Sequence, residues 1–174
     1  MSLPGTSILA KVRHLPIVSL IFRRLDPHQK DVIQLLKKTF IFGELTDQEL
    51  VHLLHLLHER TFAAGETIFN EGEPGFGLYV VLRGEVVIGK LDHSGKGKVA
   101  KLPPGEAFGE VSFIDGSGRS ATATASEKTE LLGFYHTELF DLMKHNPVLA
   151  SKILLALAKQ MGMRMRAMLQ LIQN

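Results

Sequence analysis

The placement of glycine constrains the fold of this chain more than any other feature of its sequence. Twelve of the 16 glycines lie between Gly65 and Gly118, where they separate short runs of β-type residues. These runs are Thr67–Phe69, Leu78–Leu82, Glu85–Leu91, Lys98–Leu102, Ala121–Ala125 and Leu131–Tyr135. Many short strands with glycine-rich turns are typical of a sandwich or roll. We therefore expect an antiparallel, jelly-roll-like β-roll.

Helical patterns flank the glycine-rich region on both sides. Asp26 followed by Pro27 reads as a helix start, and the run 46–49 (Thr-Asp-Gln-Glu) reads as a capping box before a second helix. After Asn146-Pro147, residues 148–172 read as one long helix, with an apolar stripe of Ile153, Leu157, Met161, Met165, Met168 and Ile172. The predicted fold class is α+β: a β-roll flanked by N-terminal helices and a long C-terminal helix.

The net charge of +2 hides an uneven distribution. Residues 1–40 carry seven Lys/Arg against two acids, residues 41–144 carry nine against sixteen, and residues 145–174 carry four and no acid. We therefore divide the chain into a basic helical N-terminal extension (1–40), a β-roll (41–144) and a C-terminal helix (145–174). The basic stretch 11–24 is a candidate contact for a partner or an anionic membrane, but a helix packed on its own domain is the simpler interpretation.

Composition excludes several classes of protein. The chain has no cysteine, so disulfides and thiolate metal sites are absent and a reducing compartment is the default. The apolar stretch 8–25 is interrupted by charges and Pro16, and it lacks the features of a signal peptide or a membrane span. We expect a cytoplasmic protein without a metal or cofactor.

Residues 103–125 carry the strongest functional signal. Gly109 and Glu110 open a short apolar turn of helix, a loop of small residues follows, and a lone Arg119 then enters a β-type run. An arginine fork suits two phosphate oxygens, and a carboxylate accepts a proton from a sugar hydroxyl. A glycine lets a ligand approach the backbone closely. These groups together predict a site for a nucleotide whose phosphate is folded against its ribose.

This segment resembles the phosphate-binding cassette of the cyclic-nucleotide-binding domain family. Phe108-Gly109-Glu110 is followed, nine residues after the glutamate, by the run 119–122 (Arg-Ser-Ala-Thr). The runs 65–69, 71–75 and 78–86 also resemble the first turns and strands of that family, which includes the catabolite activator protein, the regulatory subunits of cAMP-dependent protein kinase and cyclic-nucleotide-gated channels. One departure is Phe76-Gly77, where the family usually has an acidic residue after Pro-Gly.

The resemblance implies a role for each cassette residue. Glu110 would bind the ribose 2′-hydroxyl and Arg119 the cyclic phosphate, while Gly109, Ser120 and Ala121 line the phosphate. A serine after the arginine favours cAMP over cGMP. The long helix would close over the base and form a homodimer, and Arg164 and Met165 fall where base-capping residues are expected. The full predicted ligand-binding set is Phe108, Gly109, Glu110, Val111, Arg119, Ser120, Ala121, Arg164 and Met165.

Other functions find less support in the sequence. Between Thr61 and Tyr135 there is one histidine, His93, too few for a metal site on the strands, and no nucleophile or phosphate-loop motif points to an enzyme. His52, His55 and His58 share one helix without a matching carboxylate or cysteine pattern, so we read them as a solvated or partly packed face. We expect no nucleic acid among the partners. A ligand-free dimerisation or interaction module, or the sensor part of a longer transcription regulator, remains the alternative.

Overall fold

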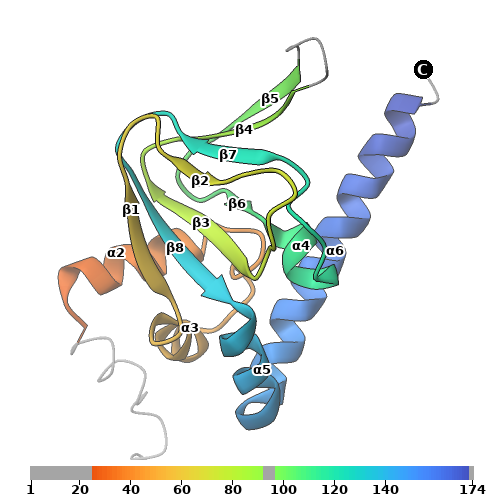
Figure 1. Ribbon diagram of the computed structural model, residues 1–174. Helices are drawn as coiled ribbons and strands as arrows, with labels where there is room; N and C mark the ends of the chain where they lie inside the picture. The colour runs from red at the N-terminus through yellow and green to blue at the C-terminus, as the bar shows by residue number, and fades with distance from the viewer. Residues whose placement is uncertain (1–24, 92–96, 173–174) are drawn as a thin grey trace, which may run out of the picture.

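The computed structural model describes residues 25–91 and 97–172, and the basic stretch 11–24 lies outside these residues. Its centre is two four-stranded antiparallel sheets (Figure 1). The first sheet has the order β1 (His58–Phe62), β8 (Thr129–Tyr135), β3 (Gly77–Arg83), β6 (Ala107–Phe108). The second has the order β2 (Thr67–Phe69), β7 (Thr122–Ala125), β4 (Val86–Leu91), β5 (Gly97–Leu102). The predicted jelly-roll-like β-roll is confirmed.

All six predicted runs are strands: Thr67–Phe69 matches β2 at both ends, and the ends of the other five differ by at most two residues. The sequence interpretation missed β1 and β6. Strand β1 reads His-Glu-Arg-Thr-Phe and is mostly exposed, so it lacks the apolar alternation of a half-buried strand. Strand β6 has only two residues and pairs with Tyr79 and Val80 of β3. Its position matters because the cassette begins at its end.

Five helices in the described residues surround the roll: α2 (Pro27–Leu36), α3 (Asp47–Leu54), α4 (Glu110–Asp115), α5 (His136–His145) and α6 (Pro147–Ile172). Both predicted helix starts are confirmed. Asp26 accepts a hydrogen bond from the Gln29 amide at 2.8 Å, and Thr46 forms a capping box with Glu49.

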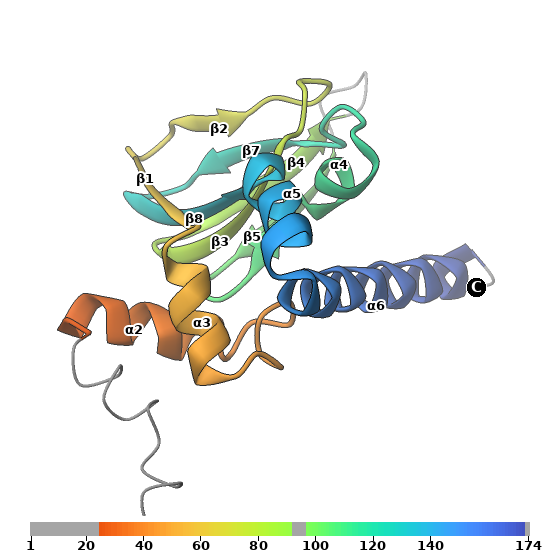
Figure 2. The same cartoon turned by 90° about the horizontal axis from the view of Figure 1, so that it is seen from below.

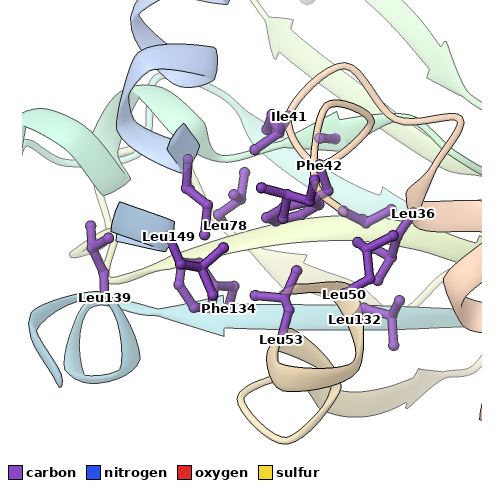
Figure 3. Close-up of a cluster of buried hydrophobic side chains, with 14 of the residues drawn as sticks. Leu36, Ile41, Phe42, Leu50, Leu53, Leu78, Leu132, Phe134, Leu139 and Leu149 are labelled. Carbon is purple, nitrogen blue, oxygen red and sulfur yellow. The ribbon is translucent and has the colours of Figure 1, made fainter. Parts of the chain in front are cut away.

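Helices and sheet share one main hydrophobic core. Phe42 meets Phe134 of β8 edge to face, with ring centroids 6.4 Å apart, while Leu36 and Leu50 from the N-terminal helices are fully buried beside them (Figure 3). Helix α2 therefore belongs to the same core as the β-roll, although the sequence division placed it in an N-terminal extension. A second, smaller cluster around Phe69 and Phe108 lies between the sheets, next to the cassette.

Helix α6 lies across one side of the domain and projects beyond it (Figures 1 and 2). Its first half is docked: Leu149, Ile153 and Leu157 are buried in the main core, and every described residue from 163 to 170 is exposed. The predicted apolar stripe therefore divides, because Ile153 and Leu157 pack against their own domain instead of facing solvent.

Candidate ligand-binding site

A cavity of about 230 Å³ lies between α4, the second sheet and α6. The cassette forms one wall, strands β4 and β5 form a second, and α6 contributes a side chain from above. The residues that line it are Phe69, Ile88, Ala100, Leu102, Phe108, Gly109, Glu110, Val111, Ser112, Arg119, Ser120, Ala121 and Arg164. Pockets for small ligands commonly combine such apolar walls with a few convergent polar groups.

Gly109 is the residue on which the cassette turns from β6 into α4. Its φ of +81° lies in the left-handed region that favours glycine. A Cβ added at this position would lie 2.6 Å from Nη1 of Arg119 and 3.0 Å from the carbonyl oxygen of Gly77. Any larger residue would therefore collide with the arginine, so the glycine permits the cation to sit directly against the backbone.

Arg119 is buried at this point, with 5% of its surface exposed. Its Nη1 donates to the Gly109 carbonyl oxygen at 3.0 Å, and its Cζ lies 4.1 Å from the centroid of the Phe69 ring, a cation–π contact. Its Nε is buried without a hydrogen-bond partner. A buried donor that lacks a partner costs free energy, so a cavity-lining arginine in this state is ready to bind an acceptor.

The protonation state of this arginine follows from its surroundings. Burial lowers the pKa of the Arg119 guanidinium below its ordinary value, while the Glu110 carboxylate and, once it is ionised at high pH, the Tyr79 phenol act in the opposite direction. An arginine keeps its proton under nearly all conditions in proteins. The cavity therefore holds a permanent cation in a largely desolvated place, where its attraction for an anion is much stronger than in water.

Glu110, the first residue of α4, is also buried, with 1% of its surface exposed. Its Oε1 accepts a hydrogen bond from Nη1 of Arg164, which reaches down from α6. A buried carboxylate needs such a partner, because an unpaired charge in the interior costs several kcal/mol. The pair thus joins the cassette to the long helix across 54 positions of sequence.

Eight of the nine predicted ligand-binding residues line this one cavity; Met165 does not. Met165 is 62% exposed, because α6 presents Arg164 to the cassette and turns the next residue to solvent. Sequence reasoning missed the wall formed by Phe69, Ile88 and β5. The period of two along β4 and β5 was the available signal, since Ile88 pairs with Ala100 and Leu102 lies two residues further on the same face.

The three histidines do not share one helix, as the sequence suggested, because α3 ends at Leu54, His55 caps it, and His58 is the first residue of β1. Across residues 25–91 and 97–172, no group of three or more His, Cys, Asp or Glu side chains could hold a metal ion. His58 instead contacts Glu138 of α5, with 2.8 Å between Nε2 and Oε1. In the same part of the chain, no helix is both long enough and apolar enough to cross a membrane.

Fold and cavity together define a β-roll that can take a small anionic ligand under a helical lid. The family model of the cyclic nucleotide-binding domain matches residues 59–146. The chain belongs to the cyclic nucleotide-binding domain family.

Curated relatives and solved structures agree with this assignment. The cyclic AMP receptor protein of Thermus thermophilus is 33% identical over 72% of the chain, and a cyclic nucleotide-gated potassium channel of Rhizobium etli is 30% identical over 69%. The chain spans 59% and 32% of the lengths of these two relatives. The N-terminal domain of a transcriptional regulator from Streptomyces coelicolor superposes with a TM-score of 0.70 at 33% identity, over 77% of this chain and 94% of that domain.

Proposed function

We propose that this protein binds a cyclic mononucleotide, cAMP in preference to cGMP, and acts as a regulatory sensor in the cytoplasm rather than as an enzyme. One observation carries the proposal: a buried arginine with an unpartnered Nε and a buried carboxylate line the same small cavity. One group suits a phosphate and the other a sugar hydroxyl. A ligand that satisfies both must hold its phosphate close to its ribose, as a cyclic nucleotide does.

The walls of the cavity offer contacts for the phosphate, the ribose and the base of such a ligand. The phosphate would meet Arg119, with the backbone at Gly109 and Ser120 beside it, and the ribose 2′-hydroxyl would donate to Glu110. The base would then lie against the apolar wall of Ile88 and Leu102, beneath Arg164. The preference for cAMP rests on Ser120, where cGMP-binding relatives tend to carry threonine. The names of the relatives, a cyclic AMP receptor protein among them, favour the same ligand.

The exposed face of α6 supports a homodimer. Seven of its residues repeat at spacings of three and four, as the a and d positions of a coiled coil do, and all but the half-buried Gly162 are exposed: Val148, Ser151, Leu155, Ala158, Gly162, Met165 and Leu169. We propose this face, which differs from the stripe predicted from sequence, as the dimer interface. Leu155→Glu should give a monomer in analytical ultracentrifugation. Met163 is also exposed but does not belong to this face, so the Met163→Glu variant should stay dimeric. A monomeric wild-type protein would disprove the interface.

Calorimetric titration with cAMP and cGMP tests the ligand. One site at 100 times its dissociation constant stabilises the fold by about 2.7 kcal/mol, so a thermal shift offers an independent reading. The proposal requires binding of at least one of the two nucleotides, with cAMP the tighter. Absence of binding in both assays would leave the family fold intact and favour a ligand-free interaction module.

A further inference from the structure

Arg119 is held in the cavity wall by two aromatic rings as well as by the carbonyl of Gly109. Its Cζ lies 4.1 Å from the centroid of the Phe69 ring and 5.7 Å from that of the Tyr79 ring. None of these three groups carries a negative charge at neutral pH, so they fix the guanidinium without neutralising it. The positive charge therefore stays available to an anion in the cavity.

The two rings differ in their access to a ligand. Phe69 lines the cavity, so a change of this residue would alter the contacts of the ligand itself. Tyr79 does not line the cavity and comes from β3, in the other sheet. An influence of Tyr79 on binding must therefore pass through one of its neighbours in the cavity wall, of which Arg119 is the charged one.

Strand pairing fixes the position of Tyr79. The residue is paired with Phe108 of β6 on one side and with Gly133 of β8 on the other. Its ring stacks on that of Phe108, with centroids 5.5 Å apart, and meets the ring of Tyr135 edge to face at 6.1 Å. Gly133 makes room for Tyr135, because a Cβ there would lie 2.9 Å from the Tyr135 hydroxyl oxygen. The register of the first sheet thus orients the ring that faces the arginine.

The phenol of Tyr79 remains neutral over the physiological range of pH. Burial and the neighbouring Tyr135 raise the pKa of this phenol above its ordinary value of 10, although the charge of Arg119 acts in the opposite direction. Below pH 10 the side chain therefore contacts Arg119 as an aromatic ring and not as a counter-ion.

An arginine that is already in place binds a phosphate with a smaller loss of entropy. Nη1 of Arg119 donates to the Gly109 carbonyl, and Nε, which has no partner, forms another edge of the planar fork together with Nη2. We propose, on the basis of the cyclic-nucleotide site described above, that Tyr79 is a positioning residue, which holds this edge of Arg119 in its phosphate-binding orientation before the ligand arrives.

Calorimetric titration of the full chain with cAMP tests this role. Tyr79→Met keeps an unbranched apolar side chain but removes the ring, so binding must now order the guanidinium, and the affinity should fall roughly 2- to 13-fold. Tyr79→Phe keeps the ring and should restore the wild-type affinity. Leu131→Ala is the matched control, because Leu131 is buried in the cluster against which Tyr79 packs but does not line the cavity. It should lower the melting temperature and leave the affinity unchanged.

A double-mutant cycle with Arg119→Met separates positioning from a purely structural role. In the Arg119→Met background, Tyr79→Met should cost no further affinity, because there is no guanidinium left to position. Losses that multiply would refute the assignment. Wild-type affinity in Tyr79→Met would also overturn it, and so would an equal loss of affinity in Leu131→Ala. If Tyr79→Met does not fold, Tyr79→Leu takes its place in both measurements.

The NMR signal of the Arg119 Nε–H group tests the same role without a ligand. This signal, assigned by its loss in Arg119→Met, should be shifted by the ring currents of the two aromatic neighbours. Tyr79→Met should move it toward the position of exposed arginines, and Tyr79→Phe should not. An unmoved signal in Tyr79→Met would overturn the positioning role whatever the affinities are. If the signal moves as expected but the wild type binds neither cAMP nor cGMP, the proposed ligand fails while Tyr79 still holds the arginine.

Discussion

Arg119→Met separates affinity from stability, because the two depend on different contacts of this arginine. In the proposed complex the guanidinium binds the phosphate. Hydrogen bonds of a charged group contribute about 1.5–3 kcal/mol, which corresponds to a loss of roughly 10- to 150-fold in affinity for cAMP. Methionine keeps an unbranched apolar chain that can still pack against Phe69, so the substitution leaves little empty volume.

The free energy of unfolding without ligand should change in another way. Arg119→Met loses the hydrogen bond to the Gly109 carbonyl, worth about 1.5–3 kcal/mol, and two cation–π contacts, with Phe69 and Tyr79, worth about 0.5–2 kcal/mol each. It also removes a buried charge whose desolvation costs several kcal/mol and whose Nε has no partner. The contacts that the variant loses and the desolvation cost that it removes nearly cancel in the free energy of unfolding. We therefore expect the melting temperature of the ligand-free variant to stay within a few degrees of the wild type, or to rise.

Calorimetric titration with cAMP and thermal denaturation of the same samples measure both quantities. Arg83→Met is the matched control, because it removes an arginine from an exposed pair with Glu130 and should alter neither. Unchanged affinity in Arg119→Met would refute the phosphate assignment. A loss of stability well beyond 3 kcal/mol would refute the argument that the site keeps a costly, incompletely paired cation for its ligand.

Three further predictions address the neighbouring groups. Gly109→Ala should abolish cAMP binding in calorimetry, whereas Gly116→Ala, also at positive φ but with open space around its Cβ, should cost only the backbone strain of about 1–3 kcal/mol. Glu110→Gln and Arg164→Met should show a coupling of about 0.5–3 kcal/mol in a double-mutant cycle on the affinity for cAMP. Additive effects would mean that Arg164 and Glu110 do not act together in ligand binding. Burial alone would raise the pKa of Glu49, but hydrogen bonds from Lys152 of α6 and from the helix cap Thr46 outweigh this effect and hold the pKa below the ordinary 4.5. Its stabilising effect is therefore complete above pH 4.5 and lost as the pH falls through the lower folded value, which acid titration of Glu49→Gln against the wild type would detect as a shallower decline.

The cassette could be predicted because its chemistry is local. Gly109, Glu110 and Arg119 lie within eleven positions. This short spacing indicates that a loop brings the arginine back to the glycine. The strands were recognisable for a similar reason, since glycine-containing turns separate apolar runs. Strand β1 was not, because its stability comes from pairing with β8 rather than from its own residues.

The contribution of α6 to the cavity depends on how the whole helix docks, which its sequence does not specify. An apolar pattern spread over much of a helix surface is compatible with several rotations, and one step of about 100° exchanges Arg164 for Met165. Burial of Leu149, Ile153 and Leu157 selects the rotation that the structure adopts. Only the packed domain therefore distinguishes the residue that faces the cassette from the one that faces solvent.

This docking also brings cations of α6 to acids of the domain. The helix carries cations and no acid, and three of its cations meet acids from three different parts of the domain: Lys152 with Glu49, Lys159 with Glu44, and Arg164 with Glu110. The first two pairs lie along the half of α6 that is already held by the core. The third lies in the cavity, on the carboxylate proposed for the ribose. Of these three pairs, only the third lies where α6 is no longer fixed by apolar packing. A nucleotide bound at Glu110 would therefore contact α6 there, and it can move that part of the helix without disturbing the core.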